Sequence, residues 1–399
     1  MNIKKYTQEL KGYWYNLTKI LNGVTNNNMN NNIIQNKKPS ILEYNLNELK
    51  EIMKENEFQS FRAEQIYNWI YKRGEINSYD NMANTPKKLR TFLNTNYSIL
   101  AVNEVKRQES SNKEATKFLL ELKDGKQIEC VLLKSDEGRQ TLCLSSQIGC
   151  ALNCQFCSTA KMGFIRNLSA GEIISQFLFV LSISEKIDNI VFMGMGEPLL
   201  NYDNVKKAIE ILNNKKGMNY GIKRITLSSS GIIKGIKQLI EDSLNIKLAV
   251  SLNSAIDSER KELMPVVSKS NSLKDLIDVL KLYQEKTGKR FTFEYVLIPE
   301  VNMKEENANE ISKLYMELNF NLNLIPYNNI NNISLSDNEK STLNHNKHNP
   351  YSTPNNRDIE RFISYFRNTG IEIVRRYRKG DDISAACGQL ATTNKNDVS

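Results

Sequence analysis

Three cysteines stand at the spacing Cys-x3-Cys-x2-Cys, at positions 150, 154 and 157. Three thiolates on one short loop can bind three irons of a 4Fe-4S cluster, because cysteine thiolate is the usual protein ligand of such clusters. The fourth iron is then left without a protein ligand, so it can chelate a small molecule and pass it an electron. The spacing of Cys150, Cys154 and Cys157 therefore predicts a redox cluster with one open iron.

Two other interpretations of the three cysteines are weaker. A structural zinc site requires four ligands, usually in paired Cys-x2-4-Cys motifs, and the sequence contains no second motif of this kind. Three unrelated buried thiols would be an unusual coincidence in a chain that has 6 cysteines among 399 residues.

The composition is that of a soluble globular protein, with 40% hydrophobic and 25% charged residues. Residues 173–183, the nearest approach to a membrane span, are too few to cross a bilayer. The N-terminus lacks the pattern of a secretory signal, and a cysteine-ligated cluster requires reduced thiols. We therefore expect no membrane span and a reducing compartment, either the cytoplasm or an organelle of bacterial descent.

The chain is basic, with 54 Lys and Arg against 45 Asp and Glu and a net charge of +9. A basic balance is typical of proteins that bind RNA or DNA. An ordinary solvated surface with surplus lysine has the same balance, so charge alone does not decide between the two.

The chain divides into five predicted segments. Residues 1–41 form a low-complexity extension whose asparagine-rich part cannot build a core. Residues 42–100 have apolar residues at helical spacing with basic and aromatic residues interleaved, which predicts a small helical accessory domain that binds RNA. Aromatic residues are more often core than binding residues, so this prediction concerns the domain and no single side chain. Residues 101–139 predict a β-rich connector, residues 140–392 the main domain, and residues 393–399 a flexible tail.

A second asparagine-rich stretch, residues 328–356, contains both histidines of the protein, His345 and His348. Its composition predicts a solvated insertion rather than a metal site.

From residue 140 onward, predicted strands alternate with predicted helices. Repeated strand–helix units favour a parallel sheet with right-handed crossovers, and six such units predict a partial (β/α)6 barrel of the α/β class. The clearest helices lie at residues 170–184, 205–213 and 273–283. The predicted strands are residues 141–145, 189–193, 224–228, 247–252, 292–298 and 321–326.

The unusual sequences follow the carboxyl ends of these strands, where parallel barrels build active sites. The cysteine loop follows the first strand. After the second, Gly194-Met195-Gly196-Glu197-Pro198 lets the backbone approach a ligand beside a carboxylate that suits an ammonium group, although a plain turn has the same pattern. After the third, Ser228-Ser229-Ser230 offers hydroxyls for a ribose or carboxylate, or caps the next helix. Asn328 follows the sixth strand, and its amide suits an adenine or ribose edge.

Two further cysteines are candidates for chemistry. Cys143 lies on the first strand, and Cys387 lies among small residues near the end of the chain. The basic run at residues 375–379 precedes Cys387, so we expect it to lower the pKa of a nearby thiol and to attract phosphate. Two inert buried thiols are the alternative, and we assign that role to Cys130.

Several motifs together resemble one family, the radical S-adenosylmethionine (SAM) adenine-C2 methyltransferases of the RlmN family. The resemblance covers about residues 42 to 392. The cysteine motif alone indicates radical SAM chemistry, and the Cys143 and Cys387 pair is similar to that of the RlmN and Cfr branch, of which Cfr modifies carbon 8. The residues that carry the resemblance are 143–159, Gly194-Met195-Gly196-Glu197-Pro198, Gly380-Asp381-Asp382-Ile383 and Ala385-Ala386-Cys387-Gly388-Gln389-Leu390.

The resemblance implies a role for individual residues. Cys150, Cys154 and Cys157 would bind the 4Fe-4S cluster, and SAM would chelate its open iron. Cys387 would be methylated and carry the carbon to RNA, Cys143 would resolve the protein–RNA adduct, and Glu129 would be the proton acceptor. The implied SAM contacts are Gly196, Glu197, Ser228, Ser251, Leu252, Asn253 and Asn328.

The resemblance also implies partners. The family acts on an adenosine of large-subunit rRNA in the peptidyl transferase centre, and bacterial members act also on an adenosine beside the tRNA anticodon. An electron donor such as flavodoxin or ferredoxin and a monomeric state are expected. Two features depart from the family pattern: Asn253 stands where many members have histidine, and the loop after Asn328 is longer than usual.

Three other functions stay open. A Cfr-like enzyme would methylate carbon 8. A non-catalytic RNA-binding factor on the same scaffold would be expected to lack at least one of the five thiols, and all five are present. A zinc-bound RNA-binding protein would contain zinc in place of iron and sulfide, so metal analysis separates it from the cluster enzyme.

The composition of the second asparagine-rich stretch leads to a first testable prediction. Deleting residues 331–349 should leave RNA methylation nearly intact, because a solvated insertion contributes neither thiols nor strands. Assays of methyl transfer by the shortened and full-length proteins check this. A soluble deletion variant without activity would contradict it.

Overall fold

The computed structural model describes residues 38–330 and 350–392. The predicted tail, most of the predicted N-terminal extension, and His345 and His348 lie outside the described residues. Contacts divide the chain into Met1–Lys38 and Pro39–Ser399, and everything below concerns the second unit. No helix among the described residues has the length and hydropathy needed to cross a membrane.

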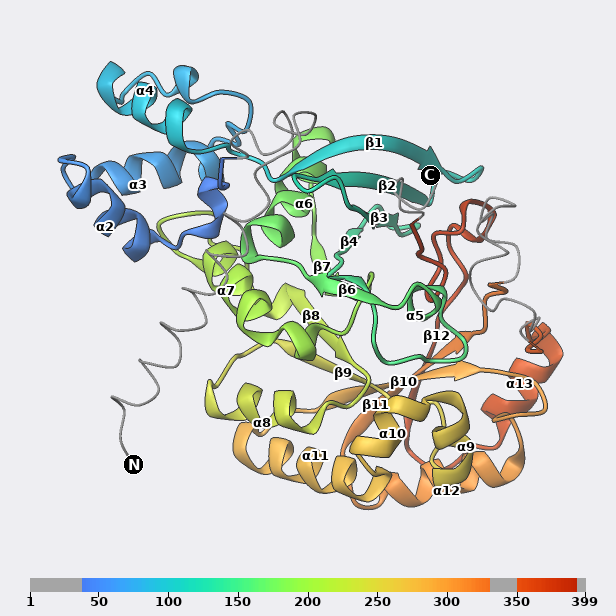
Figure 1. Cartoon of the computed structure of the whole chain (residues 1–399). Helices are drawn as coiled ribbons and strands as arrows, with labels where there is room; N and C mark the ends of the chain where they lie inside the picture. Colours follow the sequence, from blue (N-terminus) through green and yellow to red (C-terminus); the bar gives the residue numbers. More distant parts are fainter. Residues whose placement is uncertain (1–37, 331–349, 393–399) are drawn as a thin grey trace, which may run out of the picture. The chain divides into compact units, whose positions relative to one another are not determined.

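A ten-stranded mixed sheet, in the order β1-β2-β3-β4-β7-β8-β9-β10-β11-β12, forms the centre of the fold (Figure 1). The first four strands pair antiparallel, and every pairing from β4 to β12 is parallel. The antiparallel strands are β1 (Val102–Glu109), β2 (Ala115–Leu122), β3 (Gln127–Lys134) and β4 (Gln140–Cys143). The parallel series continues with β7 (Asn189–Phe192), β8 (Ile225–Ser229), β9 (Lys247–Ser251), β10 (Phe291–Leu297), β11 (Phe320–Pro326) and β12 (Glu372–Arg375).

The predicted α/β fold with a partial barrel is confirmed. All six predicted parallel strands form, with ends that differ by no more than two residues. Two differences stand out. Strand β12 was not predicted, because it is short and falls within a charged run whose residues are all partly or fully exposed. The predicted β-rich connector is an extension of the main sheet, because β3 pairs with β4 along residues 131–134.

Helices follow the strands of the parallel series and lie along one side of them (Figure 1). Ser169 and Glu172 form a capping box at the start of the buried helix α6, and Ser272 caps α11. The predicted helices at 170–184, 205–213 and 273–283 are confirmed as α6, α7 and α11. The helices are α6 (Ala170–Ile183), α7 (Tyr202–Asn213), α8 (Ile233–Glu241), α9 (Asp257–Leu263), α10 (Pro265–Ser270), α11 (Leu273–Thr287), α12 (Glu305–Tyr315) and α13 (Asn356–Ser364).

The N-terminal part of the unit is helical, as its apolar spacing predicts. Tyr67 and Tyr71 are buried, with ring centroids 4.7 Å apart, so these two aromatic residues belong to the core. Lys72, Lys87 and Lys88 are exposed, which leaves positive charge at the surface. The elements are η1 (Ile41–Glu43), α2 (Leu46–Glu55), α3 (Arg62–Tyr67), η2 (Asn68–Lys72), η3 (Tyr79–Asn81) and α4 (Lys87–Asn96).

Glu43 joins this helical part to the first turn of α6. Its carboxylate accepts hydrogen bonds from the Ser169 hydroxyl at 2.5 Å and from the Gly171 N–H at 3.0 Å. A Cβ on Gly171 would lie 2.4 Å from that carboxylate, so only glycine permits the approach. A carboxylate is also favoured at this helix N-terminus by the helix dipole.

Glu43→Gln should lower the free energy of unfolding by about 1–3 kcal/mol, because an amide cannot satisfy both donors at the start of α6. Glu51→Gln is the matched control, since Glu51 forms a solvent-exposed ion pair with Lys54, and should change stability little. Urea unfolding of the three proteins measures the difference. Equal midpoints for Glu43→Gln and the parent would show that these bonds do not hold the helical part in place.

Candidate active site

The cysteine loop is framed by a two-stranded hairpin, β5 (Gln147–Gly149) and β6 (Phe164–Asn167). Cys150 donates its N–H to the Gly163 carbonyl at 2.8 Å. Gly149 has a φ of +69°, and a Cβ there would lie 1.7 Å from the Gly163 oxygen, so only glycine closes the loop. Cys157 occupies the N-cap of the short helix α5 (Ser158–Lys161).

The three thiols lie close enough to one another to interact electrostatically. Burial raises the pKa of Cys150 to about 12 and raises that of Cys157. Burial also raises the pKa of Cys154, and the charges of Cys157 and Cys150 raise it further. Desolvated thiolates close together are stabilised by bound cations, because a cation offsets both the burial and the mutual repulsion.

The chemistry of the donor set fits a 4Fe-4S cluster. Across residues 38–330 and 350–392, no group of three or more His, Cys, Asp or Glu side chains converges as a single-ion site would require. A 4Fe-4S cluster places each thiolate on a different iron, so its cysteine sulfurs need not converge on one point.

One pocket lies between the cysteine loop and the carboxyl ends of the parallel strands. Strands β7 to β11 all contribute residues to its wall, and so do the cysteine loop and the C-terminal segment that carries Cys387. The residues that line it include Cys150, Cys154, Cys157, Gly194, Gly196, Glu197, Ser228, Ser229, Ser230, Ser251, Asn253, Glu294, Asn328, Cys387 and Gly388.

Gly196 and Glu197 are built into the wall of this pocket. Gly196 has a φ of +98°, and a Cβ would lie 2.4 Å from the Gln147 side chain. Glu197 is buried, and its two carboxylate oxygens accept the N–H of Leu199 at 3.0 Å and of Ser230 at 2.7 Å. Burial raises the pKa of Glu197, and these hydrogen bonds oppose the increase.

The serines after β8 divide between two roles. The Ser229 hydroxyl accepts the N–H groups of Gly231 and Ile232, so this serine caps the turn before α8. Ser228 and Ser230 also line the pocket.

Two of the three SAM contacts predicted at the end of β9 line the pocket, and the third does not. Ser251 and Asn253 line the pocket, whereas the Leu252 side chain is buried and does not. The Asn253 amide is engaged at both ends: it contacts the Met264 sulfur at 3.2 Å and accepts the Val296 N–H at 3.0 Å. Asn253 therefore ties the end of β9 to β10.

Cys387 is held beside the cysteine loop by hydrogen bonds to the backbone around it. Asn328 donates its amide to the Cys387 carbonyl at 3.0 Å. The Ser158 N–H reaches the Gly388 carbonyl at 2.7 Å, and the Thr159 hydroxyl reaches the Leu390 carbonyl at 2.7 Å. The Cys387 side chain itself is exposed and lines the pocket.

Cys143 approaches Cys387 although 244 positions separate them in the sequence. Cys143 is buried on β4 outside the pocket lining. Burial raises the pKa of Cys143, and the charge of Cys387 raises it further, so the two thiols lie within electrostatic range. All six cysteines are free.

The basic run acts on the Cys387 pKa in the expected direction, but it does not set the net change. Arg376 does act in that direction, but the removal of water by surrounding protein atoms is the larger effect and the pKa is raised.

Glu129 lies on β3 beneath the C-terminal segment and outside the pocket lining. It is buried, pairs with Lys117 at 2.9 Å and accepts the Ala391 N–H at 3.0 Å. Burial raises the pKa of Glu129, and Lys117 is the main opposing influence.

Sequence reasoning missed Glu294, a buried carboxylate that lines the pocket. Asn323 donates to its Oε1 at 2.9 Å, while Oε2 has no hydrogen-bond partner among the described residues. Burial raises the pKa of Glu294, and Arg376 opposes this. A single acidic residue within the apolar strand Phe291–Leu297 was the available signal.

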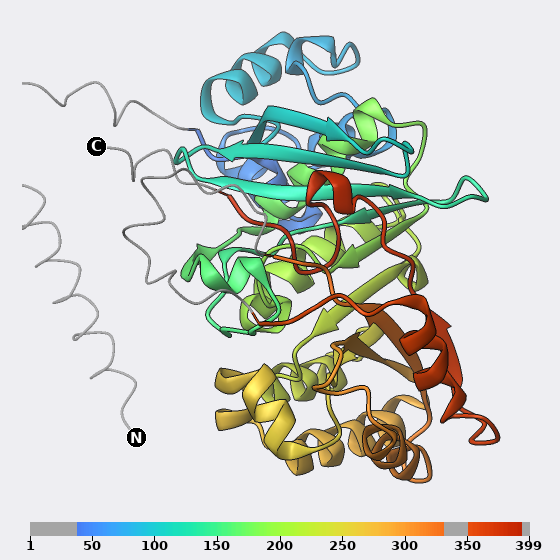
Figure 2. The same cartoon turned by 90° about the vertical axis from the view of Figure 1, so that its right-hand side faces the viewer.

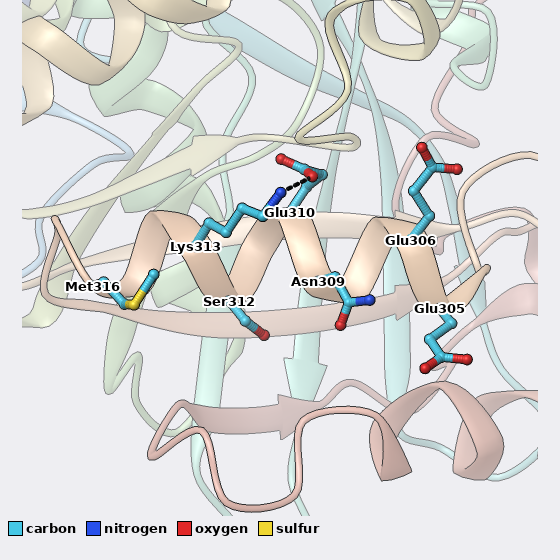
Figure 3. Close-up of a pocket in the computed structure, with 7 residues that line it drawn as sticks. All are labelled: Glu305, Glu306, Asn309, Glu310, Ser312, Lys313 and Met316. Carbon is cyan, nitrogen blue, oxygen red and sulfur yellow. Dashed lines mark hydrogen bonds and ion pairs between the residues drawn. The ribbon is translucent and has the colours of Figure 1, made fainter.

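A second hollow lies along α12 and is shown in Figure 3. All of its lining residues, from Glu305 to Met316, belong to α12 or to the residue that follows it. Its lining contains no cysteine, unlike that of the pocket at the cysteine loop.

The fold and the pocket define a member of the radical SAM superfamily. The model of that superfamily matches residues 144–310, and the model of the ribosomal RNA large subunit methyltransferase N-terminal domain matches residues 40–99. A radical SAM methyltransferase from Sphaerobacter thermophilus has a similar structure, with a TM-score of 0.80 and 36% identity, covering 88% of this chain and 99% of that one.

Similar curated proteins identify the family. The probable dual-specificity RNA methyltransferase RlmN of Clostridium perfringens strain SM101 is 41% identical over 353 residues, 88% of this chain and 96% of that protein. The protein of the same name from Pseudothermotoga lettingae is 43% identical over 337 residues, 84% of this chain and 92% of that protein. The chain belongs to the RlmN family of radical SAM RNA methyltransferases.

Cys154→Ala should prevent the protein from holding a full 4Fe-4S cluster after anaerobic reconstitution, because it removes one of the three loop thiolates that would bind the cluster. Iron and sulfide analysis and the cluster's visible absorbance measure the loss. Cys130→Ala is the matched control, since Cys130 is also buried but lies on β3, and it should retain the cluster. A full cluster in Cys154→Ala would show that other residues bind it.

Proposed function

We propose that this protein methylates carbon 2 of an adenosine in large-subunit rRNA, in the peptidyl transferase centre, and of an adenosine beside the tRNA anticodon. The observation that carries the proposal is the position of Cys387 in the same pocket as the three loop cysteines, with Cys143 within electrostatic range. Family membership supports the RNA substrate, and the dual specificity named for the relatives supports two classes of RNA.

Cys150, Cys154 and Cys157 would hold the 4Fe-4S cluster at the pocket wall. When bound there, the cluster would supply the electron for the reductive cleavage of SAM. The strand ends would orient SAM. Gly196 lets the chain pass close to it, and Ser228 and Ser251 offer hydroxyl groups toward the pocket. The side-chain oxygen of Asn328, Oδ1, is buried and has no hydrogen-bond partner among the described residues. It can accept a hydrogen bond from SAM.

Carbon 2 of adenine is not nucleophilic, so ordinary polar methyl transfer from SAM fails there. Covalent attachment divides this difficult transfer into easier steps. Cys387 would carry the methyl group, and the radical derived from SAM would take one hydrogen atom from it. The carbon left behind would bond to carbon 2 of adenine, and the adduct would then give up its one unpaired electron, for which the cluster would be the acceptor. The exposure of Cys387 gives its sulfur access to both SAM and RNA.

Release of the product would use the two groups behind Cys387. Glu129 takes the proton from carbon 2 of the adduct. The Cys143 thiolate attacks the Cys387 sulfur, and an S–S bond forms as the bond from Cys387 to the methyl-derived carbon breaks. The electron pair of that bond leaves with the carbon, which gains a proton and becomes the methyl group.

Mass spectrometry of nucleosides from rRNA and tRNA, after anaerobic reaction with SAM and a reductant, tests the function. We expect 2-methyladenosine in both RNAs, identified against authentic standards. The 8-methyl isomer would indicate a Cfr-like enzyme. SAM-independent RNA binding without methylation would indicate a non-catalytic factor. Flavodoxin or ferredoxin as the electron donor, a monomeric state and a cytoplasmic location remain predictions.

Variants that lack Cys143 or Cys387 should fail at different steps of the reaction. Cys143→Ala should form the covalent protein–RNA adduct and accumulate it, because the attacking sulfur is missing. Cys387→Ala should form no adduct, because the carrier is missing. Denaturing gels with labelled substrate RNA distinguish the two outcomes. Equal crosslinking by both variants, or full turnover by either, would mean that the thiols do not have these roles.

A further inference from the structure

One buried ion pair contacts the C-terminal segment on both sides of Cys387. Lys117 on β2 and Glu129 on β3 approach to 2.9 Å. The Lys117 ammonium also donates to the Ser384 carbonyl at 3.3 Å, and Glu129 Oε2 accepts the Ala391 N–H at 3.0 Å. The two partners therefore hold the chain three residues before and four residues after Cys387.

Strand register explains why this pair lies beside the thiols. Lys117 is paired with Val131 on β3, and Val131 is paired with Cys143 on β4. Partners in register project from the same face of a sheet, and Glu129 shares that face because it lies two residues from Val131. The C-terminal segment crosses this side of the antiparallel strands (Figure 2).

Burial makes the two charges depend on each other. The side chains of Lys117 and Glu129 are only 9% and 6% exposed. Removing one partner of a buried pair leaves the other charge without compensation. The other charged or titratable groups that act on this site are Lys106 on β1, which acts without a contact, and Cys130, the neighbour of Glu129 on β3.

We propose that Lys117 is a positioning residue for the reaction, which ties the Cys387-bearing segment to the sheet and holds Glu129 in the charged form that accepts a proton. The inference rests on the proposed function, because it concerns the release step. Since Lys117 opposes the effect of burial on Glu129, its removal should raise the pKa of Glu129 further. A base whose pKa rises is protonated up to a higher pH, so release should fail at pH values where the parent still works.

The first measurement is single-turnover release of RNA from the covalent adduct as a function of pH. In Lys117→Met, which removes the charge but keeps an unbranched side chain, the acidic limb should move upward by about one to three pH units, the range for losing a nearby opposite charge. Lys117→Arg keeps the charge and should restore most of the profile. Lys106→Met is the matched control and should shift the limb much less, because Lys106 does not touch Glu129.

The second measurement needs neither cluster nor RNA. Hydrogen exchange followed by mass spectrometry should show faster exchange in peptides spanning residues 380–392 of Lys117→Met, and the Arg variant should remain close to the parent. SAM cleavage without RNA, measured in the reconstituted variants, confirms that the barrel is intact. In a Lys117→Met protein that cleaves SAM, unchanged exchange or an unchanged acidic limb would overturn the proposal. A parent protein that makes no adduct and no methyladenosine would instead refute the proposed function.

Discussion

The docking of the C-terminal segment against the cysteine loop is the contact on which the two-thiol site depends. Cys387 lies 230 positions beyond Cys157 in the sequence. The hydrogen bonds that hold it beside the cysteine loop are all accepted by backbone carbonyls of the C-terminal segment. Gly388 is needed at this point because it has a φ of +81° and a Cβ would approach the Phe156 carbonyl to 3.1 Å. A contact made of backbone groups keeps the cysteine side chain itself free, and this is why Cys387 is exposed while its chain neighbours Ala385 and Ala386 are buried.

The sequence was enough to predict the parallel strands because each is an apolar run whose burial is continuous or alternating. Strand β12 lacked this signal, and its only apolar residues, Ile373 and Val374, remain partly or fully exposed. The cysteines were found by spacing, which is local information. The contact between Lys117 and Glu129 depends on the register of β2 against β3. Glu294 and Cys387 line the same pocket only because the fold brings them there. Such pairs cannot be found from spacing along the chain.

Charge placement was the least predictable property of the site. Arg376 is close in sequence to Cys387 and acts on its pKa in the expected direction, yet the protein atoms packed around this pocket-lining thiol raise the pKa overall. The same holds for Glu129, whose pKa is raised despite contact with a lysine. In each case a sequence shows which charges are near but not how much water the fold removes, and desolvation of a charged group is large in a protein interior.

Two carboxylates line the pocket, and they differ in what they can still bind. Both oxygens of Glu197 accept backbone N–H groups, so this carboxylate mainly fixes the loops after β7 and β8. One oxygen of Glu294 accepts a hydrogen bond from Asn323, and its other oxygen is buried without a hydrogen-bond partner among the described residues. An unsatisfied buried acceptor is costly unless a donor arrives. A hydrogen-bond donor on a bound molecule therefore gains more binding free energy at Glu294 than at Glu197. In the sequence, by contrast, the Gly-x-Gly-Glu-Pro motif made Glu197 the more conspicuous residue.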